Sequence, residues 1–381
     1  MKRLAILTGS DIRAYGGGEK YVIELVKRLN GFGITVYSFI DKNQIRIKDK
    51  KIKKMLKAKL IYFNTITIPI LKERLPLTLS GLFMLKQLCK YNTIYIVDPS
   101  VPTIFIILIY IKFKKQKPKI IFGAHNPGFL KRISQENTSI KKLLLKFYSP
   151  IYKTVLFKVP NIHVLNNSDQ KILKKIGYKG NIYKIPNFLY YKKSDIKIQD
   201  NKNRFIVLFG GRLTVYTKGI DLLTEIIKKV ISGNKKILFQ IFGSGEDGQK
   251  IIENLAKEYP ENINYLGFIS NKDLEDKYKN SSLYIMTSRS ETFSLVTLEA
   301  QAHGLPVIAF DIKGPNDIIN KSSGSIIKTF DTEAFSNKIL KYYNLWKNGK
   351  LNIKYKKRIT NYTFNKYSDK KIIPKIKKMF I

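Results

Sequence analysis

The chain has 381 residues but a single cysteine, Cys89, and only three histidines. One cysteine excludes a disulfide within the chain, and three scattered histidines provide no obvious metal site. The longest apolar run, residues 104–111, is far shorter than the roughly 20 residues that a helix needs to span a bilayer. We therefore predict no bound metal and no membrane-spanning helix, and we expect a cytoplasmic protein that is soluble or peripherally bound to a membrane.

Acidic residues are also scarce, since the chain has 28 of them against 70 lysines and arginines, a net charge of +42. The basic residues concentrate in two segments, with nine in 42–59 and thirteen in 341–381, and each segment contains one acid. Such an excess attracts nucleic acid, anionic lipid surfaces or polyanionic substrates. A lysine-rich bias of the whole proteome also explains it, because Ile, Asn, Tyr and Lys are all abundant, and both explanations stay open.

The chain does contain enough apolar residues for two cores. Its hydrophobic content of 44% is typical of a globular protein, and 381 residues suffice for two domains. Repeated strand–helix–strand patterns predict an α/β fold with parallel sheets. A polar segment at 188–203 is the best linker candidate, which places the domains at 1–190 and 191–360.

Residues 282–312 carry the clearest functional signal, and they predict a strand, a polar loop, a helix and a second strand. A helix N-terminus binds phosphate through its unpaired N–H groups and its partial positive charge. Glu291 lies at the mouth of the predicted helix, and Glu299 follows about two turns along it. Their carboxylates can accept hydrogen bonds from the hydroxyls of a sugar and of a ribose. Solvated surface acids are the alternative for both residues.

The stretch SETFSLVTLEAQAHGLPVIA resembles the signature of the retaining glycosyltransferases of family 4, in which two glutamates separated by seven residues precede a G-L-P-V-I strand. The resemblance implies a GT-B fold, in which two Rossmann-like domains face each other across a cleft that binds a nucleotide sugar. It also implies that residues 361–381 form a helix crossing back to the first domain. Thr292 and Ser294 stand where the family usually has glycine. The donor-binding residues implied in this stretch are Glu291, Thr292, Phe293, Ser294, Leu295 and Glu299.

The first domain opens with a strand, a glycine turn and an amphipathic helix. Gly17 and Gly18 in that turn resemble the glycine loop of the family, where the missing Cβ lets the backbone approach a phosphate or a sugar. An ordinary helix-start loop is the alternative, and the turn lacks the dinucleotide fingerprint G-x-G-x-x-G. His125 follows the strand KIIFGAH, at the sheet edge where ligands bind. The resemblance implies that His125 contacts the donor sugar, and a purely structural histidine is the alternative.

In the second domain the first strand runs into Gly211 and Arg212. Arg212 and Lys218 suit a diphosphate, because arginine can bind it bidentately and lysine acts as a point charge. Five residues separate them, whereas the family pattern has four, so we expect the loop to bulge. Ordinary surface charge is the alternative. The resemblance further implies donor contacts at the ends of two later strands, namely at Gly243, Gly245, Phe268 and Ile269.

These features together predict a retaining glycosyltransferase that moves a sugar from a UDP- or GDP-sugar to a glycan or a lipid-linked acceptor. No D-x-D motif follows a strand and no His/Cys cluster is present, so we expect no metal and no cofactor besides the nucleotide-sugar co-substrate. The resemblance implies front-face attack, in which the leaving phosphate helps to deprotonate the acceptor. The residues assigned to catalysis are His125, Arg212, Lys218 and Glu291.

Other functions and partners remain open at this point. One is a nucleotide-sugar epimerase of the same fold, and another is a nucleic-acid-binding protein on a decayed transferase scaffold, although no nucleic-acid-binding signature is present. An anionic membrane is a further candidate partner, because residues 42–59 and an expected helix at 138–158 combine lysines with apolar side chains. The apolar side chains expected to contact lipid are Ile52, Met55, Leu56, Leu143, Leu144 and Phe147.

Overall fold

The computed structural model describes residues 1–41, 45, 47–68, 73–98, 101–125, 153–199, 203–245 and 247–381. The chain divides into two compact units, which are taken here one at a time. Unit 1 comprises Met1–Asn187 and Ile372–Ile381, and unit 2 comprises Phe188–Lys371.

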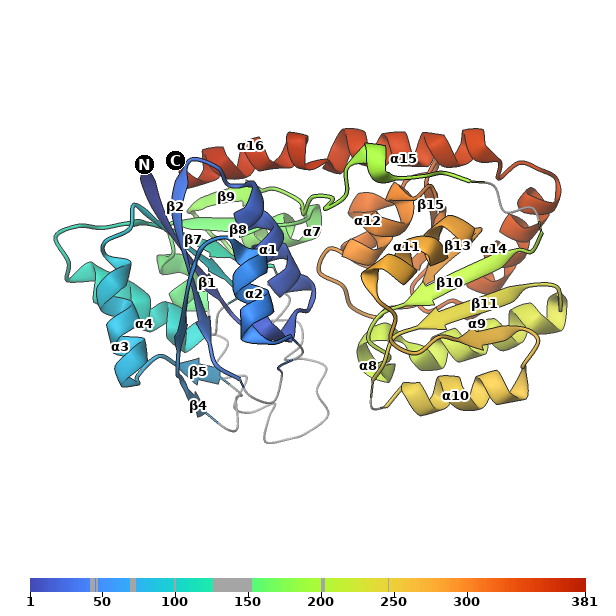
Figure 1. The fold of residues 1–381 in the computed structure, drawn as a ribbon, viewed down its shortest axis with the longest axis horizontal. Helices are drawn as coiled ribbons and strands as arrows, with labels where there is room; N and C mark the ends of the chain where they lie inside the picture. Colours follow the sequence, from blue (N-terminus) through green and yellow to red (C-terminus); the bar gives the residue numbers. More distant parts are fainter. Residues whose placement is uncertain are drawn as a thin grey trace. The chain divides into compact units, whose positions relative to one another are not determined.

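Unit 1 is built on a parallel sheet of seven strands in the order β3-β2-β1-β6-β7-β8-β9 (Figure 1). Its central strands are buried along most of their length because helices cover both faces. A short antiparallel hairpin of β4 (Ile66–Ile68) and β5 (Glu73–Leu75) lies outside the sheet. The strands of the sheet are β1 (Lys2–Thr8), β2 (Phe32–Phe39), β3 (Lys59–Phe63), β6 (Thr93–Val97), β7 (Lys119–Gly123), β8 (Asn161–Val164) and β9 (Asn181–Lys184).

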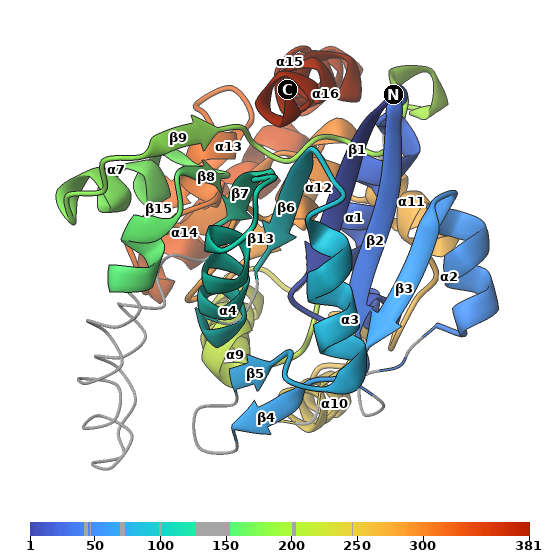
Figure 2. The ribbon, with the colours of Figure 1, turned by 90° about the vertical axis from the view of Figure 1, so that its left-hand side faces the viewer.

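The helices of unit 1 connect these parallel strands, and α3 and α4 lie side by side on one face of the sheet (Figure 2). Their inner sides, with Met84, Leu88 and Ile107, are buried in one core with strand residues such as Ile94. The helices are α1 (Gly17–Arg28), α2 (Asp49–Leu56), α3 (Leu79–Leu88), α4 (Val101–Lys112), α7 (Asn167–Lys175) and α16 (Asp369–Phe380), with a short 3-10 turn η1 (Ile12–Ala14).

Unit 2 contains a parallel six-stranded sheet in the order β12-β11-β10-β13-β14-β15. Its strands are β10 (Ile206–Gly210), β11 (Leu238–Phe242), β12 (Ile263–Tyr265), β13 (Leu283–Met286), β14 (Val307–Phe310) and β15 (Gly324–Ile327). Its helices are η3 (Lys193–Asp195, 3-10), α8 (Val215–Lys218), α9 (Ile220–Gly233), α10 (Gln249–Glu258), α11 (Asn271–Asn280), α12 (Leu295–Ala302), α13 (Pro315–Ile318), α14 (Thr332–Lys347) and α15 (Ile353–Tyr367). The predicted α/β class with two Rossmann-like sheets is therefore confirmed.

Amphipathic helices hold the sheet of unit 2 in place. Leu223, Ile227 and Val230 of α9 are fully buried, and they share one core with Phe335 and Ile339 of α14. Burying a side chain of this size stabilises the fold by about 1.5–3 kcal/mol. This packing fixes α9 behind β10, so the carboxyl ends of neighbouring strands and the loops that follow them meet at one edge of the sheet.

The final segment differs from the single helix expected at 361–381, because two helices meet at Ser368. Ser368 has an extended backbone, with ψ of 151°, which ends α15 before α16 begins. The end of α16 belongs to unit 1, where Thr93 Oγ1 donates a hydrogen bond of 2.9 Å to the carbonyl of Phe380. The Phe380 ring also packs against Tyr95, with ring centroids 5.2 Å apart.

The expected lipid-contacting role of α2 is wrong for its two main apolar residues. Ile52 and Leu56 are completely buried in unit 1, so they cannot reach a bilayer. The expected helix at 138–158 lies mostly outside the described residues, including Leu143, Leu144 and Phe147. No helix in the described ranges combines the length and the apolar character that a bilayer span requires.

Candidate functional site

The loops that follow β10 and β13 meet at the carboxyl edge of the unit 2 sheet, where these two strands are neighbours. The Lys218 ammonium, at the end of α8, forms an ion pair with the carboxylate of Glu291. Ser288 Oγ donates a hydrogen bond of 3.0 Å to the same Glu291 oxygen. Only 20% of the Lys218 side chain and 13% of the Glu291 side chain are exposed, so water screens this pair only partly. The structure thus brings together two residues that the sequence analysis assigned separately.

Backbone and side-chain contacts join the two loops on either side of this ion pair. Thr287 Oγ1 donates to the carbonyl oxygens of Lys218 and Gly219, at 2.9 and 3.2 Å. Gly219 adopts a left-handed backbone, with φ of 65°, and a Cβ at this position would overlap the carbonyl of Thr287. A side chain at residue 219 would therefore force the loops apart and displace Lys218.

Arg289 fixes the same two loops, although the sequence analysis gave it no role. Its guanidinium binds both carboxylate oxygens of Asp221, at 2.6 and 2.7 Å, and also donates to the carbonyl of Val215. This bidentate contact with Arg289 lowers the pKa of Asp221 below its ordinary value. No local pattern in the sequence indicates this pairing, because 68 positions separate Asp221 from Arg289.

Arg212 differs from Lys218 in having its side chain exposed. Among the described residues, no side-chain hydrogen bond or ion pair involves its guanidinium. The Arg212 guanidinium can therefore bind an anion such as a diphosphate without first breaking an internal contact, whereas Lys218 must first leave Glu291.

Two of the predicted donor-binding glycines have a structural explanation in the fold itself. A Cβ at Gly243 would overlap the carbonyl of Gly211, and a Cβ at Gly245 would overlap the carbonyl of Leu213. The loops after β10 and β11 are therefore packed backbone against backbone, and Leu213 N donates to the carbonyl of Ser244 at 2.9 Å. Glycine is required here for close packing, whether or not a ligand also binds.

Helix α12 begins in the conformation expected of a glycine. Ser294, its N-cap residue, has φ of 70°, which is unusual for a residue with a side chain. Its hydroxyl does not cap the helix but contacts Met286 Sδ at 3.1 Å and Thr297 Oγ1 at 2.8 Å. Consequently the Ser294 side chain does not cap the first N–H groups of α12, which begins at Leu295. The N-terminus of a helix attracts anions through such N–H groups. Thr292 is half-buried in front of the helix.

Two other predicted donor-binding residues are buried rather than open. Phe293 is 2% exposed and packs against the ring of Tyr367, with centroids 6.0 Å apart. Glu299 is 6% exposed and lies close to Tyr278, whose pKa is raised well above its ordinary value by burial and by the nearby carboxylate. A ligand hydroxyl that reaches Glu299 would therefore bind a carboxylate in a largely water-free setting.

Phe268 and Ile269 follow β12 and point to different surroundings. Phe268 is 80% exposed, so its ring is open for stacking on a planar ligand. Ile269 packs against the apolar cluster that contains Tyr278 and Leu305. The Phe268 ring is therefore open to a ligand, whereas the Ile269 side chain is partly buried.

His125, the predicted catalytic residue of unit 1, is 5% exposed and belongs to a chain of hydrogen bonds. Its Nε2 lies 3.3 Å from the hydroxyl of Tyr95, and that hydroxyl lies 2.7 Å from Nδ1 of His163. His163 Nε2 in turn lies 2.8 Å from the carbonyl of Ile185. On the other side, His125 Nδ1 lies 3.5 Å from a carboxylate oxygen of Asp98.

The backbone carbonyl of Ile185 sets the direction of this hydrogen-bond chain, because a carbonyl can only accept. His163 must therefore donate from Nε2 and accept at Nδ1 from the Tyr95 hydroxyl. The Tyr95 oxygen can then accept a hydrogen bond from Nε2–H of His125. Burial, together with the neighbouring His125, lowers the pKa of His163 to about 3, so His163 stays neutral near neutral pH. Tyr95 and His163 were not predicted, and their separation in the sequence gave no signal.

The glycine turn of unit 1 begins α1 as expected, and Gly17 and Gly18 are both exposed. Nothing lies within 4 Å of a Cβ placed at Gly18, so the fold does not require a glycine there. Glu19 is buried just beyond the turn and accepts a hydrogen bond from the Ser10 hydroxyl. The open glycines beside a helix N-terminus are compatible with a ligand that approaches the backbone closely.

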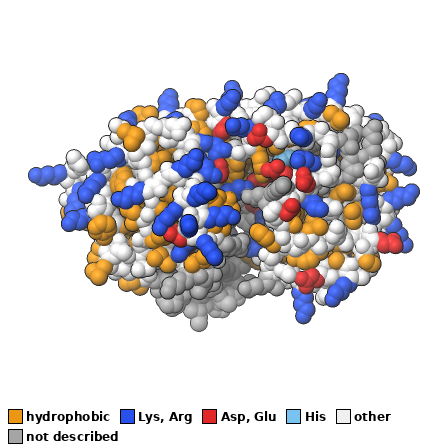
Figure 3. All heavy atoms as spheres, viewed as in Figure 1, with side chains coloured by type: hydrophobic (Ala, Val, Ile, Leu, Met, Phe, Trp, Pro, Cys, Tyr) orange, Lys and Arg blue, Asp and Glu red, His pale blue; other side chains and the backbone are white. Residues whose placement is uncertain are grey.

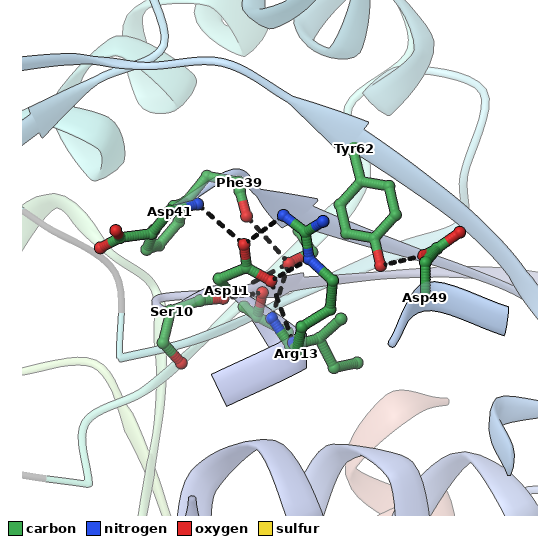
Figure 4. Close-up of polar contacts among 10 residues, drawn as sticks. Ser10, Asp11, Arg13, Phe39, Asp41, Asp49 and Tyr62 are labelled. Atoms are coloured by element: carbon green, nitrogen blue, oxygen red, sulfur yellow. Dashed lines mark hydrogen bonds and ion pairs between the residues drawn. The ribbon is translucent and has the colours of Figure 1, made fainter. Parts of the chain in front are cut away.

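A second polar cluster lies at the ends of the first strands of unit 1 (Figure 4). The buried carboxylate of Asp11 accepts three hydrogen bonds from Arg13 and one of 2.8 Å from the backbone N–H of Asp41. Burial alone would raise the pKa of Asp11, but these donors hold it below its ordinary value. Arg13 also lies over the ring of Tyr62, whose hydroxyl donates to Asp49. Because these polar groups hydrogen-bond to one another, the cluster holds the loops after β1 and β2 together.

Within the described ranges, no group of three or more His, Cys, Asp or Glu side chains is arranged to hold a metal ion. The positive charge at the carboxyl edge of unit 2 comes instead from Arg212, Lys218 and the start of α12. These groups can together stabilise a phosphate.

Comparison with known proteins gives two family models that adjoin each other along the chain. The model described as Glycosyltransferase Family 4 matches residues 15–190, and that described as Glycosyl transferases group 1 matches residues 191–365. The amylovoran biosynthesis glycosyltransferase AmsD of Erwinia amylovora is 31% identical over 52% of this chain and 55% of its own length. The poly(ribitol-phosphate) α-N-acetylglucosaminyltransferase of Staphylococcus aureus is 30% identical over 59% of this chain and 43% of its own. The chain thus spans about half the length of these curated relatives.

Solved structures match over nearly the whole chain. Anabaena HepE in complex with UDP has a TM-score of 0.77 and 15% identity, covering 100% of this chain and 99% of its own. The sucrose-phosphate synthase of Thermosynechococcus elongatus has a TM-score of 0.76 and 18% identity, covering 100% of this chain and 98% of its own. At these identities the likeness concerns the fold, and it confirms the expected two-domain GT-B fold.

Proposed function

The chain belongs to the glycosyltransferases of family 4, and on this premise we propose that it transfers a sugar from a nucleotide-diphosphate donor to a glycan or a lipid-linked acceptor. The observation that carries the proposal is the set of groups at the carboxyl edge of unit 2. There the Lys218–Glu291 pair lies beside the start of α12, which Ser294 does not cap, and Arg212 and Phe268 are exposed.

Each of these groups suits one part of a nucleotide sugar. Arg212, Lys218 and the N–H groups of α12 would neutralise the diphosphate, whose charge grows as the sugar leaves. Glu299 would accept hydrogen bonds from the ribose hydroxyls, and Glu291 from the hydroxyls of the donor sugar. Phe268 would stack on the base, with backbone contacts from Gly211, Gly243 and Gly245.

The proposed reaction retains the configuration at the anomeric carbon. The bond from this carbon to the diphosphate oxygen breaks, and the acceptor oxygen forms its bond on the same face. The acceptor proton passes to the departing phosphate, so no side chain is needed as a base. His125 is proposed as a further contact of the donor sugar, and Gly17 and Gly18 as backbone contacts. The protein contributes mainly charge stabilisation and positioning.

UDP is the donor nucleotide we favour, because several similar structures were solved with UDP or UDP-glucose bound. The acceptor class follows from the curated relatives, whose names refer to amylovoran biosynthesis and to poly(ribitol-phosphate). We therefore propose an acceptor of the cell-surface polymer class, free or linked to lipid. We also propose that the protein acts in the cytoplasm, either free or at the membrane surface.

A donor screen by thermal shift tests the proposal, since a ligand that binds only the folded state raises its stability. UDP, UDP-sugars, GDP and GDP-sugars should be compared with AMP as a negative control. Arg212→Ala should abolish the shift and lower turnover by about 100-fold, close to 3 kcal/mol. Arg358→Ala, an exposed arginine on α15, is the matched control and should behave like the wild type. The proposal fails if no nucleotide sugar stabilises the wild-type protein, or if folded Arg212→Ala keeps normal turnover.

A further inference from the structure

An apolar surface lies on the outer side of α3 and α4, outside the two segments in which the sequence suggested lipid contact. Three of its members are on α3, three are on α4 or just after it, and one is on the β4–β5 hairpin. All are at least 41% exposed: Ile66, Leu79, Leu82, Phe83, Phe105, Ile109 and Phe113. We call these seven residues the α3–α4 face.

The α3–α4 face is contiguous in the fold. Helices α3 and α4 lie side by side on one face of the unit 1 sheet in both ribbon views, and the β4–β5 hairpin lies next to them (Figures 1 and 2). Leu79, Leu82 and Phe83 follow one another at helical spacing, as do Phe105 and Ile109. Each set therefore forms a stripe along its helix on the side away from the core.

These helices are more apolar than their position requires. The sequence of α4, VPTIFIILIYIK, is apolar on all sides, which is typical of a helix that is buried all round. Yet only one side of α4, with Ile104, Ile107 and Ile111, is buried in unit 1. An exposed apolar patch on this scale marks an interaction surface.

The charges around the α3–α4 face indicate the partner. Residues 77–97 and 101–119 contain no Asp or Glu. Six exposed lysines follow the apolar stripes at the C-terminal ends of the two helices, namely Lys86, Lys90, Lys112, Lys114, Lys115 and Lys117. Figure 3 likewise draws blue and orange side chains intermingled over this end of unit 1. A second copy of the chain would bring the same lysines face to face, whereas an anionic surface would complement them.

We propose that the α3–α4 face docks on an anionic lipid bilayer, with its apolar side chains in the interfacial layer and its lysines on the lipid phosphates. Both helices run antiparallel to the strands they connect, so their apolar N-terminal turns lie toward the carboxyl edge of the unit 1 sheet. Docking therefore places the bilayer along this face of the sheet, and the carboxyl edge with His125 borders the docked surface, where a lipid-linked acceptor could be delivered. Only this consequence, delivery of a lipid-linked acceptor, rests on the proposed function.

Flotation with vesicles tests the docking surface directly. The wild-type protein should bind vesicles of phosphatidylcholine and phosphatidylglycerol at low salt, ignore pure phosphatidylcholine, and be released as salt is raised. The double variant Leu82→Ser/Phe83→Ser should bind at least tenfold more weakly, because two exposed apolar side chains are lost without disturbing the core. Replacing Lys112, Lys114, Lys115 and Lys117 by Gln should weaken binding by at least tenfold as well.

A charge-matched control separates this surface from the general positive charge. Replacing Lys347, Lys350, Lys354 and Lys357 of unit 2 by Gln removes the same charge from exposed positions and should leave binding nearly unchanged. If this control weakens binding as much as the unit 1 variant, the attraction is nonspecific and the proposal is wrong. It is also wrong if the wild type ignores anionic vesicles, or if the apolar variant abolishes self-association in the ultracentrifuge without affecting vesicles.

A fluorescent reporter gives a residue-level readout, because Trp346 is the one tryptophan of the chain. In a Trp346→Phe background, the fluorescence emission of a tryptophan introduced by Phe83→Trp should shift to shorter wavelength when anionic vesicles are added. Brominated acyl chains should quench this emission. Ile353→Trp, at an exposed position of unit 2, should not respond in the same background, and the opposite pattern refutes the assignment. Thermal stabilisation by UDP is measured on the same samples. A protein that UDP stabilises but that does not bind vesicles contradicts the docking proposal alone, and the opposite result contradicts the proposed transferase function alone.

Discussion

The Lys218–Glu291 ion pair predicts opposite effects of one substitution on binding and on turnover. In the ligand-free protein Glu291 occupies the ammonium that a diphosphate would need. Glu291→Gln keeps the size of the side chain and its capacity to bond Ser288, but removes the charge that holds Lys218. We therefore expect UDP to bind more tightly to Glu291→Gln, and sugar transfer to become slower because the donor sugar loses a carboxylate.

The size of the expected gain in UDP affinity follows from how exposed the Lys218–Glu291 pair is. Exposed ion pairs contribute at most about 1 kcal/mol, while breaking a fully buried pair costs about 3–5 kcal/mol. With side chains 20% and 13% exposed, this pair lies between these limits, and the amide introduced by Glu291→Gln retains part of its energy. A net gain of about 1 kcal/mol for UDP corresponds to roughly fivefold tighter binding. The loss of turnover should be larger, on the order of 100-fold.

Isothermal titration with UDP and a product assay measure the two effects on the same preparation. Glu258→Gln is the matched control, because Glu258 also pairs with a lysine, Lys228, but both side chains are nearly half exposed. This control should change neither quantity. If Glu291→Gln binds UDP no better, or more weakly than the wild type, then Lys218 does not bind the diphosphate and the reasoning is wrong.

Other predictions concern metal, packing and pH. Transferase activity should survive EDTA, and a complete loss that Mg²⁺ or Mn²⁺ restores would contradict the metal-free assignment. Gly243→Ala should lower the free energy of unfolding by at least about 2 kcal/mol, because its Cβ would overlap the carbonyl of Gly211; Gly18→Ala, at an open position, should cost far less. Asp11→Asn should cost about 3 kcal/mol near pH 7 by urea titration. The difference in unfolding free energy between wild type and Asp11→Asn should shrink as the pH falls below 3.8. Below that pH the Asp11 carboxylate is protonated in the unfolded state, and at still lower pH it is protonated in the folded state as well. His163 titrates at 6.5 when unfolded and at about 3 when folded, so the unfolded state takes up a proton first. Wild-type stability should therefore fall with decreasing pH by up to about 1.4 kcal/mol per unit below 6.5. His163→Phe should reduce that slope, and an unchanged slope between pH 6.5 and 5 would show that His163 is not the group responsible.

The sequence by itself determined the class of fold and the strand ends that carry the site. Short apolar runs such as residues 206–209 and 283–286 predict buried strands, and helical spacing in α9 needs no tertiary information. Gly211, Arg212 and Glu291 were found because local chemistry marks them: each directly follows, or lies shortly after, a buried strand. Resemblance to family 4 then supplied the roles that residue type alone left open.

Tertiary structure alone decided which of these residues meet. Lys218 and Glu291 are 73 positions apart, and Arg289 and Asp221 are 68 apart, so no local pattern predicts either pair. The same holds for the chain of hydrogen bonds from His125 through Tyr95 to His163, which links the neighbouring strands β7, β6 and β8 of unit 1. The local sequence also did not predict which apolar residues are buried. Ile52 and Leu56 of α2 are in the core, whereas Leu82 and Phe83 of α3 are exposed. Both helices mix lysine with apolar residues, and only the packing of each helix on the sheet determines which side is left for a partner.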